Sequence, residues 1–354
     1  MKKGKLLVVM MYSGGGCFQY AKELIARLTD NPVVYMNSYQ PETHNIANYY
    51  PLKTFGFSSW ERIFSIVRFV LNVFISGLRG KYSGLLLFGP SPWDNYVVQA
   101  FSFCKKPVFY VVHDGEMHLG DKNDKTQNRL LNATRQADYL IFLSNQVKNQ
   151  IKRLYGIHKP SLVLPHGLIS YGEVPVSLRQ RKEKPVLLFL GRLSRYKGID
   201  LLLEAMEQVD NNVYKKLIIA GAPVGDYHVT VDHPQIEVRE EWLTEADILA
   251  YLQEADILLF PYLEASQSGV ATLAINYLLP SIATQVGAFE EQFGEAALFI
   301  EPDSTALAEA IQLLCTDTNL YQDLSEKLAI LREHYSWQYL SESLTEFIKQ
   351  HTAK

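Results

Sequence analysis

The chain is poor in cysteine and carries little net charge, and both shortages narrow the class of protein. Its 354 residues include three cysteines, Cys17, Cys104 and Cys315, and its formal net charge is −4. Three widely spaced cysteines form neither a disulfide framework nor a zinc-binding pattern, which indicates a reducing, cytoplasmic environment. Proteins that bind nucleic acid are distinctly basic, so we expect no nucleic-acid partner, and any anion site has to be local.

Two further patterns are missing. No Asp-x-Asp sequence occurs in the chain, which removes a common anchor for a divalent metal. Residues 60–81 are mostly apolar, but Arg62, Arg68, Arg79 and Lys81 interrupt or flank them, so a membrane-spanning helix is not expected. The pattern predicts an amphipathic helix that either packs against a sheet or lies on an anionic membrane. We expect packing as its main role; the alternative is peripheral contact with the inner face of the cell membrane.

Apolar runs alternate with helical patterns along the whole chain, which is typical of parallel sheets covered by helices on both faces. A chain of 354 residues exceeds what one hydrophobic core usually organises, so two domains are expected. The predicted strands are residues 6–10, 33–36, 84–88, 108–112, 139–143, 162–164, 186–190, 217–220, 236–238, 257–260, 281–283 and 297–300. The predicted fold class is α/β, with two doubly wound, Rossmann-like domains that face each other across a cleft and bind ligands at the carboxyl ends of their strands.

Breaks in this periodicity set the predicted domain boundaries. Gly172, Pro175 and the charged run 179–184 interrupt the pattern after the first series of strands. We therefore predict an N-terminal domain over residues 1–170, a connector over 171–184, a C-terminal domain over 185–335 and a last helix within 336–354.

The most informative motif is Gly-Arg-Leu-Ser-Arg-Tyr-Lys-Gly at residues 191–198, which follows a predicted strand and precedes a helical pattern. A strand, a glycine turn with cations and a helix start together form a site suited to a diphosphate. Arg192 offers a planar fork of donors for phosphate oxygens, and Lys197 offers a compact point charge. The alternative is that both are ordinary surface cations in a loop.

A second candidate phosphate site follows the predicted strand 257–260. Ser268, Gly269 and Val270 stand at the start of a small-residue helix, where backbone N–H groups and the helix dipole would face a phosphate. A plain N-cap is the other role open to Ser268. Because a carboxylate is unfavourable beside an anion, we expect Glu264 to bind sugar hydroxyls, unless it is a solvated loop residue.

These residues resemble a known family. Gly191-Arg192-Leu193, Lys197-Gly198, Glu264 and the segment 280–287, taken in order, are similar to the nucleotide-sugar-binding domain of family 4 type, retaining, GT-B-fold glycosyltransferases, over about residues 186–300. The resemblance implies that the positively charged pair neutralises the donor diphosphate and that Glu264 contacts the transferred sugar. It also implies an acceptor-binding N-terminal domain and a last helix that packs back towards that domain.

The Glu-x7-Glu element of that family is altered here. Counting eight residues from Glu264 reaches Thr272, and alignment on Pro280 places Leu273 at the second glutamate. The usual carboxylate contact to the ribose is therefore missing, and Thr272 is the candidate for a weaker contact. The glutamates at 290–291 resemble the family's Gly-Gly-x-x-Glu turn; they either position the base or ribose, or serve as helix-start carboxylates.

In the first half, His113 and Asp114 follow a predicted strand, within the sequence His-Asp-Gly-Glu-Met-His. His113 can donate and accept a proton near neutral pH, and Asp114 can fix its tautomer or bind acceptor hydroxyls. Related enzymes often carry such a pair near the reacting sugar. The rival interpretation is a zinc site of His113 and His118 with Asp114 or Glu116, but this spacing matches no standard zinc pattern, so we expect no metal.

The glycine loop at residues 13–16, between the first strand and the first helix, allows a ligand to approach the backbone closely. It is not a Gly-x-Gly-x-x-Gly sequence, so no nicotinamide cofactor is predicted. By resemblance, Gly15 and Gly16 lie near the donor phosphate or the acceptor.

The resemblance implies a hexosyltransferase that moves a sugar from a nucleotide diphosphate sugar to a saccharide or lipid-linked saccharide, with retention and without a cofactor. The expected process is bacterial surface polysaccharide biosynthesis, whether of lipopolysaccharide O-antigen, capsule or exopolysaccharide. Two alternatives remain. One is a nucleotide-sugar epimerase of the same fold, and the other is a non-catalytic glycan-binding or scaffold relative.

Overall fold

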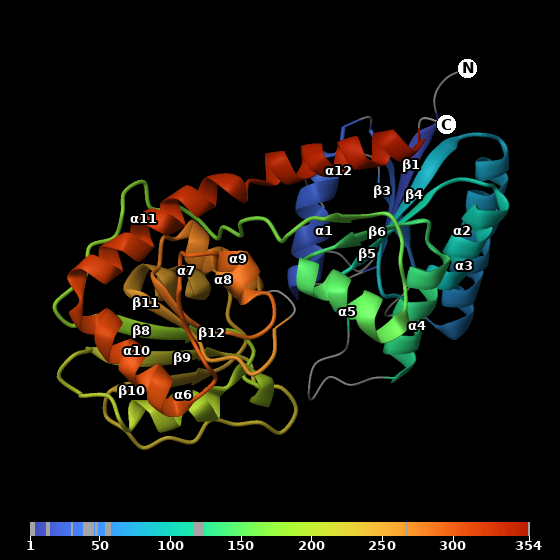
Figure 1. Ribbon diagram of the computed structural model, residues 1–354. Coiled ribbons are helices and arrows are strands. Elements are labelled where there is room, and N and C mark those ends of the chain that lie inside the picture. Colours follow the sequence, from blue (N-terminus) through green and yellow to red (C-terminus); the bar gives the residue numbers. More distant parts are fainter. Residues whose placement is uncertain are drawn as a thin grey trace. The chain divides into compact units, whose positions relative to one another are not determined.

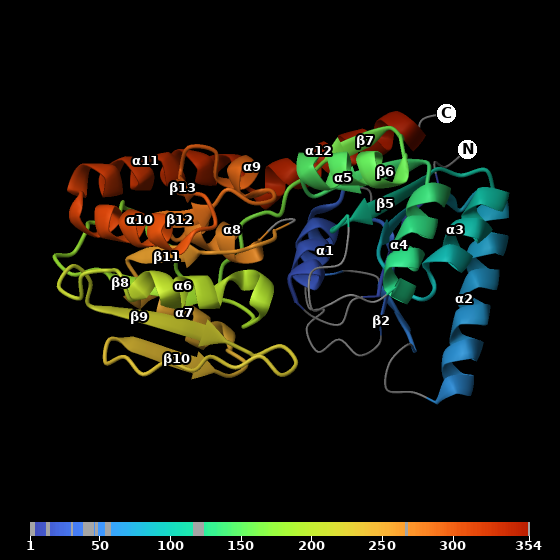
Figure 2. The ribbon, with the colours of Figure 1, turned by 60° about the horizontal axis from the view of Figure 1, so that its bottom comes forward.

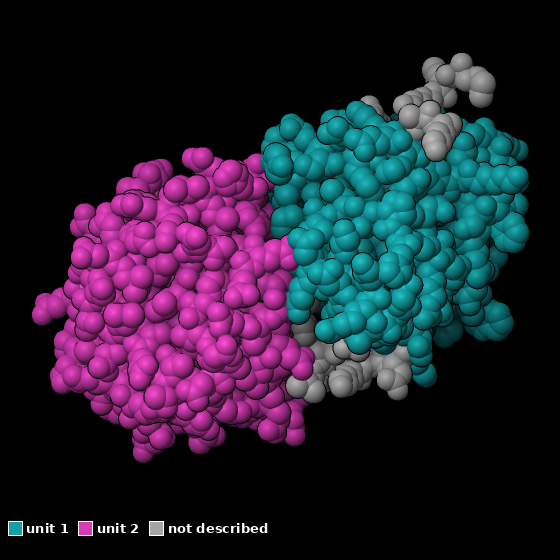
Figure 3. Space-filling model, in the orientation of Figure 1, with its two compact units in different colours: residues 1–117, 122–165, 337–354 teal, residues 118–121, 166–336 magenta. Residues whose placement is uncertain are grey.

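The computed structural model describes residues 4–11, 15–29, 31–37, 46, 49–53, 58–115, 124–265 and 268–352. Two compact units are present, coloured separately in Figure 3. Unit 1 contains the described residues up to Pro165 together with residues 337–352, and unit 2 contains His166–Ser336. The chain therefore returns to unit 1 for its last helix.

Unit 1 is built on a parallel sheet. Its strands are β1 (Lys5–Met10), β2 (Val33–Asn37), β3 (Tyr49–Leu52), β4 (Tyr82–Phe88), β5 (Val108–Val112), β6 (Tyr139–Phe142) and β7 (Ser161–Val163). Among the described residues they follow the order β3-β2-β1-β4-β5-β6-β7, and every neighbouring pair is parallel. Since β1 lies inside the sheet and the chain builds outward on both sides of it, the unit is doubly wound.

Helices cover both faces of this sheet (Figures 1 and 2). They are α1 (Gly15–Arg27), α2 (Ser59–Leu78), α3 (Asp94–Phe103), α4 (Asp124–Gln136), α5 (Asn145–Tyr155) and α12 (Trp337–Thr352). Successive residues of a strand point to opposite faces, so Leu7 and Val9 pack in the core under α2 to α5, whereas Val8 and Met10 pack in the core under α1 and α12. Both cores lie within unit 1.

Unit 2 repeats this architecture with a single core. Its strands are β8 (Val186–Leu190), β9 (Lys216–Gly221), β10 (Ile236–Glu240), β11 (Ile257–Phe260), β12 (Ser281–Thr284) and β13 (Leu298–Ile300), in the parallel order β10-β9-β8-β11-β12-β13. Its helices are the short 3-10 helix η1 (Arg195–Lys197) and α6 (Ile199–Met206), α7 (Glu245–Glu254), α8 (Gly269–Asn276), α9 (Phe289–Phe293), α10 (Ser304–Thr316) and α11 (Thr318–His334). The strand order reverses between β8 and β11, which is where open parallel sheets bind ligands. The predicted α/β class with two parallel sheets is confirmed.

The segment that the sequence assigns to a connector packs onto unit 2. The chain leaves unit 1 after Pro165, earlier than the predicted boundary at residue 170. Within residues 171–184, the Arg179 guanidinium donates to Leu252 O and Ala255 O, both at 2.7 Å, and to Tyr277 O at 3.0 Å. These three carbonyls satisfy a half-buried cation, so the charged run is part of the second unit.

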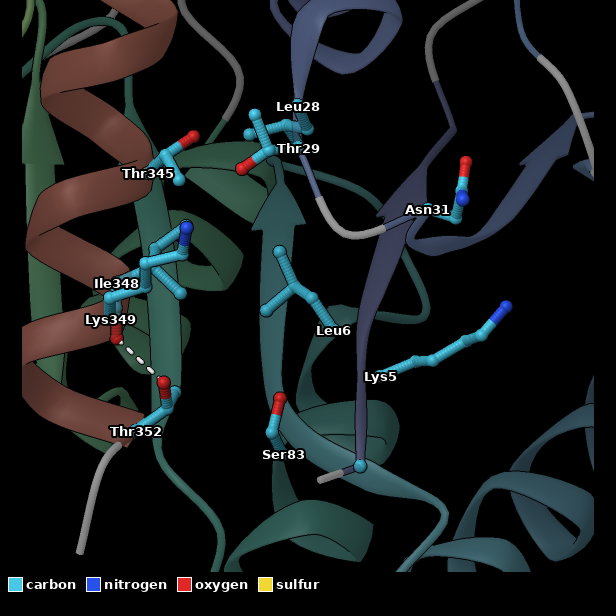
Figure 4. Close-up of a pocket in the computed structure, with 11 residues that line it drawn as sticks. Lys5, Leu6, Leu28, Thr29, Asn31, Ser83, Thr345, Ile348, Lys349 and Thr352 are labelled. Carbon is cyan, nitrogen blue, oxygen red and sulfur yellow. Dashed lines mark hydrogen bonds between the residues drawn. The ribbon is translucent and has the colours of Figure 1, made fainter. Parts of the chain in front are cut away.

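A cavity of about 520 Å³ opens in unit 1 at the amino ends of β1 and β4 (Figure 4). Lys5 and Lys349 are among its lining residues, but Figure 4 shows Lys5 pointing away from α12, so the two cations do not converge. The cavity lies at the amino edge of the sheet, opposite to the edge where doubly wound sheets bind ligands.

None of the helices formed by the described residues has the length and apolar character that a membrane-spanning helix needs.

One buried carboxylate makes the stability of unit 1 depend on pH. Asp94, at the start of α3, is 1% exposed and accepts hydrogen bonds from Ser91 N at 2.7 Å, from Ser91 Oγ, and from Tyr110 Oη at 3.2 Å. Burial raises the pKa of Asp94 to about 6, against the effects of these hydrogen bonds and of Arg129.

A folded-state pKa above the unfolded value means that Asp94 stabilises the fold below about pH 4, and that this contribution is lost as the pH rises through 6. We expect a loss of about 3 kcal/mol across this range. Asn cannot ionise, so the Tm of Asp94→Asn should rise relative to that of the wild type between pH 4.5 and 7.5. Thermal unfolding followed by circular dichroism measures the difference, and parallel pH curves for the two proteins would contradict the assignment.

Candidate functional site

The loops after β8 and β11, which are neighbouring strands in unit 2, touch through their backbones. Gly191 and Gly198 bound the loop after β8 and have φ values of 133° and 67°. A Cβ atom at Gly198 would lie 1.8 Å from Pro261 O, so only glycine fits this approach. In addition, Leu263 N donates to Tyr196 O at 2.8 Å. These contacts fix the position of the two loops relative to each other.

The two predicted phosphate-binding cations in this region are held by tyrosine side chains. Arg192 Nη2 donates to Tyr196 Oη at 3.1 Å. Lys197 Nζ lies 3.6 Å from the centre of the Tyr262 ring and 5.2 Å from that of Tyr196, which is a cation–π arrangement. Tyr262 is 1% exposed, and burial raises the pKa of its hydroxyl, so the ring stays neutral beneath the lysine.

Ser268 stands at the start of α8, next to Tyr262. It is 3% exposed, and its Oγ has no hydrogen-bond partner among the described residues. Gln292 holds the backbone of Ser268 in place: Ser268 N donates to Gln292 Oε1 at 3.1 Å, and Gln292 Nε2 donates to Ser268 O at 2.8 Å. A buried hydroxyl of this kind at a helix N-terminus is suited to bind an anion.

The two candidate phosphate sites are therefore parts of one site. A Cβ atom at Gly191 would lie 3.6 Å from Val270 Cγ2, so the loop after β8 also adjoins the first turn of α8. The half-buried residues Gly269 and Val270 provide backbone N–H groups at this N-terminus. The site combines two cations, a helix N-terminus and one buried hydroxyl at the strand-order reversal of unit 2.

The structure gives Thr272 a different role from the predicted contact with a ligand. Its side chain is fully buried, and its Oγ1 donates to Gly269 O at 2.7 Å and accepts from Ile169 N at 3.4 Å. A hydroxyl occupied in this way inside α8 is not presented to a ribose. Leu273, which takes the place of the family's second glutamate, is also buried, at 3% exposed.

The glutamates near the site occupy different environments. Glu264 is half-buried, two residues after Tyr262 in the loop after β11. Glu290 and Glu291 are exposed in the first turn of α9, where the helix dipole favours carboxylates, and Gln285 Nε2 donates to Glu290 Oε1 at 3.3 Å. This placement agrees with the role of helix-start carboxylates.

The predicted residues of unit 1 lie at the carboxyl edge of its sheet. His113, directly after β5, is 7% exposed and packs edge-on against Tyr20 of α1, with 5.3 Å between the ring centres. Asp114 is half-buried, and Gly15 and Gly16 begin α1. Tyr20 therefore links the histidine to the helix that follows the glycine loop.

The proposed zinc ligands Glu116 and His118 lie outside the described residues. Among the residues that are described, no group of three or more histidine, cysteine, aspartate or glutamate side chains is arranged to hold a metal ion. The positive charge of the candidate site in unit 2 comes from the side chains of Arg192 and Lys197.

Sequence reasoning missed three residues that shape this site. Tyr196 and Tyr262 hold the two cations, and Gln292 fixes the backbone of Ser268. Tyr196 and Tyr262 stand inside the motifs that the sequence does reveal, but an aromatic residue beside a cation signals nothing until the loops meet. Gln292 lies 24 positions from its partner, so no local pattern could reveal it.

The Tyr262 ring can be tested by comparing Tyr262→Phe with Tyr262→Leu. Phenylalanine keeps the cation–π contact with Lys197, whereas leucine removes it, which we expect to weaken binding of a nucleoside diphosphate by about 10- to 30-fold. Calorimetric titration with a nucleoside diphosphate and with its monophosphate measures the effect. The ratio of the two affinities should fall only for Tyr262→Leu, and a ratio that is the same in both variants would contradict the role of the ring.

Comparisons with known proteins give a family match for part of unit 2 and the fold of the chain. Residues 184–317, which lie in unit 2, match the family described as glycosyl transferases group 1. Solved glycosyltransferase structures share the architecture of two parallel-sheet α/β units, and the fold is GT-B.

Individual proteins that resemble the chain include a curated glycosyltransferase and two solved structures. The putative teichuronic acid biosynthesis glycosyltransferase TuaC of Bacillus subtilis is 29% identical over 196 residues, which cover 51% of this chain and 47% of TuaC. The chain spans about half the length, or less, of the curated relatives it matches. HepE of Anabaena in complex with UDP and glucose has a TM-score of 0.74 at 15% identity, covering 98% of this chain and 100% of HepE. Sucrose-phosphate synthase of Thermosynechococcus elongatus has a TM-score of 0.73 at 15% identity, with 99% of both chains covered.

Proposed function

We propose that the protein is a family 4 type, retaining hexosyltransferase that transfers a sugar from a nucleotide diphosphate sugar to a saccharide or lipid-linked saccharide. The observation that carries this proposal is that the two candidate phosphate-binding segments, the loop after β8 and the start of α8 after β11, meet in one site. Arg192, Lys197 and the N-terminus of α8 supply positive charge for a group that carries two phosphates. The match of residues 184–317 to glycosyl transferases group 1 supports the reaction class.

The proposed chemistry follows from this charge distribution. The bond between the anomeric carbon and the phosphate oxygen breaks, the sugar passes through an oxocarbenium-like state, and the diphosphate leaves with the bonding electrons. Arg192 and Lys197 stabilise the departing charge, which is the term that usually contributes most to catalysis. The acceptor oxygen attacks from the same face and its proton passes to the leaving phosphate, so that the configuration is retained.

Other side chains would bind the two substrates. Glu264, half-buried beside the diphosphate site, would hydrogen-bond hydroxyls of the transferred sugar. His113 and Asp114 would hydrogen-bond the acceptor and orient its hydroxyl. No divalent metal takes part in the proposed reaction, because the two side-chain cations neutralise the diphosphate.

Relatives support the proposed donor and process. HepE was solved with UDP and glucose, and TuaC is named for teichuronic acid biosynthesis. We accordingly propose a bacterial surface polysaccharide, whether O-antigen, capsule or exopolysaccharide, as the product.

The test is a thermal-shift panel of UDP, GDP, ADP and CMP with their sugars, followed by mass spectrometry of donor cleavage. One nucleoside diphosphate should raise the Tm, its sugar nucleotide should be hydrolysed slowly, and a chelator should leave that rate unchanged. No shift with any nucleotide would favour a non-catalytic scaffold. Conversion of the donor to an isomeric nucleotide sugar would identify an epimerase instead.

A further inference from the structure

Helix α2 exposes an apolar stripe along its whole length. Seven large apolar side chains between 45% and 82% exposed recur at intervals of one to four residues: Trp60, Ile63, Phe64, Val67, Leu71, Ile75 and Leu78. Large apolar residues scattered singly on a surface are ordinary, but a continuous row over a 20-residue helix is not.

This stripe is separate from the face that packs on the sheet. Ile66, Phe69 and Val73 of the same helix are 4%, 3% and 0% exposed, and the last two belong to the core beneath α2. The helix therefore has apolar residues on both sides. Packing in unit 1 explains only the inner side.

The apolar surface extends onto α3, which lies next to α2 in Figures 1 and 2. Cys104 Sγ donates to Phe74 O at 3.5 Å, which fixes the end of α3 against the last turns of α2. Phe103, immediately before this cysteine, is 76% exposed. We call the exposed side of α2 together with Phe103 the α2–α3 face.

The charges around this face are mostly positive. Residues 62–113 contain six cations and a single acid, Asp94, which is buried. The cations are Arg62, Arg68, Arg79, Lys81, Lys105 and Lys106. Glu61, in the first turn of α2, is engaged in the helix cap, where it accepts from Ser58 N at 3.1 Å and from Ser58 Oγ at 2.8 Å. The rest of the chain is acidic overall, so this positive charge is local.

We propose that the α2–α3 face docks on the surface of an anionic lipid bilayer, with α2 lying in the plane of the interface. The apolar stripe would enter the boundary between headgroups and acyl chains, where burial of apolar side chains drives binding. The flanking arginines and lysines have long apolar stems and would reach the lipid phosphates. A row of large apolar side chains bordered mainly by cations matches both the apolar interior and the anionic surface of such a bilayer.

Vesicle flotation of the full chain, without nucleotide or acceptor, tests the proposal independently of the proposed reaction. The protein should bind vesicles of equal parts phosphatidylglycerol and phosphatidylcholine, and bind pure phosphatidylcholine much more weakly. Raising the ionic strength to about 1 M, where the Debye length is about 3 Å, should release most of it. Absence of binding to the anionic vesicles would overturn the proposal.

Paired variants locate the contact. Phe64→Glu with Leu71→Glu changes two side chains that are 69% and 54% exposed, so the fold should persist, and vesicle binding should fall at least about tenfold. The matched control is Ile330→Glu with Leu313→Glu, at exposed positions on helices of unit 2, which should bind as the wild type does. Equal losses of vesicle binding in both pairs of variants, or no loss in Phe64→Glu with Leu71→Glu, would exclude the α2–α3 face as the membrane contact.

Trp60, at 82% exposed, provides a second measurement. Brominated lipids in the anionic vesicles should quench the fluorescence of the wild type, and this quenching should be lost in Trp60→Phe but kept in Trp242→Phe. Trp242 is 80% exposed and lies in unit 2, which makes it a matched control. If sedimentation instead shows a dimer that Phe64→Glu disrupts, without vesicle binding, the face is an interface between copies of the chain and the proposal is wrong.

Discussion

Replacing Arg192 with alanine is expected to lower kcat/KM for the sugar-nucleotide donor by about 100-fold or more, because a charged donor to the departing diphosphate is lost. Arg192 is exposed, so the change removes no core packing. Donor affinity should also fall, since the guanidinium binds phosphate before as well as during bond cleavage. Steady-state kinetics and calorimetric titration with the nucleoside diphosphate measure the two effects.

Arg195 provides the matched control for this substitution. It lies in the same loop and is equally a surface arginine, but its guanidinium lies 5.9 Å from the centre of the Tyr227 ring. Arg195→Ala should change kcat/KM by no more than about threefold, the effect of an ordinary surface charge. Arg192→Lys should fall between the wild type and Arg192→Ala, because lysine keeps the charge but not the planar fork. Equal losses at Arg192 and Arg195 would show a general field effect and would rule out a specific diphosphate contact.

Replacing Gly198 with alanine is expected to destabilise unit 2 by about 3–5 kcal/mol and to weaken donor binding. The added Cβ atom would lie 1.8 Å from Pro261 O, a backbone atom that cannot rotate away. The loop after β8 would have to move away from the loop after β11. Lys197, the residue directly before this glycine, would then leave its place over Tyr262.

The expected loss has two causes, the left-handed backbone conformation at residue 198 and the clash of the new Cβ atom with Pro261 O. A substitution at Gly225 separates them. Both glycines have a φ of 67°, but a Cβ atom at Gly225 would meet nothing within 4 Å. Gly225→Ala should therefore cost only the left-handed backbone penalty of about 1 kcal/mol. Differential scanning calorimetry of the two variants measures the difference in stability. A loss for Gly198→Ala no larger than for Gly225→Ala would mean that the two loops are not in tight contact.

Much of the architecture was visible in the sequence because buried parallel strands are continuous apolar runs. Val186–Leu190 and Val108–Val112 have the bounds that their apolar runs predict. Strand β3, Tyr49–Leu52, was missed because it carries Pro51 and has little apolar pattern. It lies at the edge of its sheet, where proline is tolerated, and only its pairing with β2 reveals it as a strand.

In the candidate site, too, some residues could be found from the sequence and others could not. Arg192 and Lys197 stand in a local motif, so they could be proposed as phosphate-binding cations from the chain alone. The tyrosines that contact these cations could not be predicted. Tyr262 reaches Lys197 only because two loops that are more than 60 residues apart in the sequence touch each other. The burial of Thr272 is a related case: counting along a motif gives the position of this residue, but it does not show that the side chain is buried and that its hydroxyl bonds inside the helix.

The return of α12 to unit 1 has a consequence for how the chain folds as it is synthesised. Leu340, Leu344 and Ile348 complete the core beneath α1, yet the ribosome adds them after every residue of unit 2. Unit 2 is contiguous and can fold as soon as it emerges, whereas unit 1 is made first but waits until the end of synthesis for α12, which covers part of one face of its sheet. During this interval the apolar residues of β1 and α1 that α12 later covers can bind chaperones or aggregate. The half of the protein that is made first is therefore completed last.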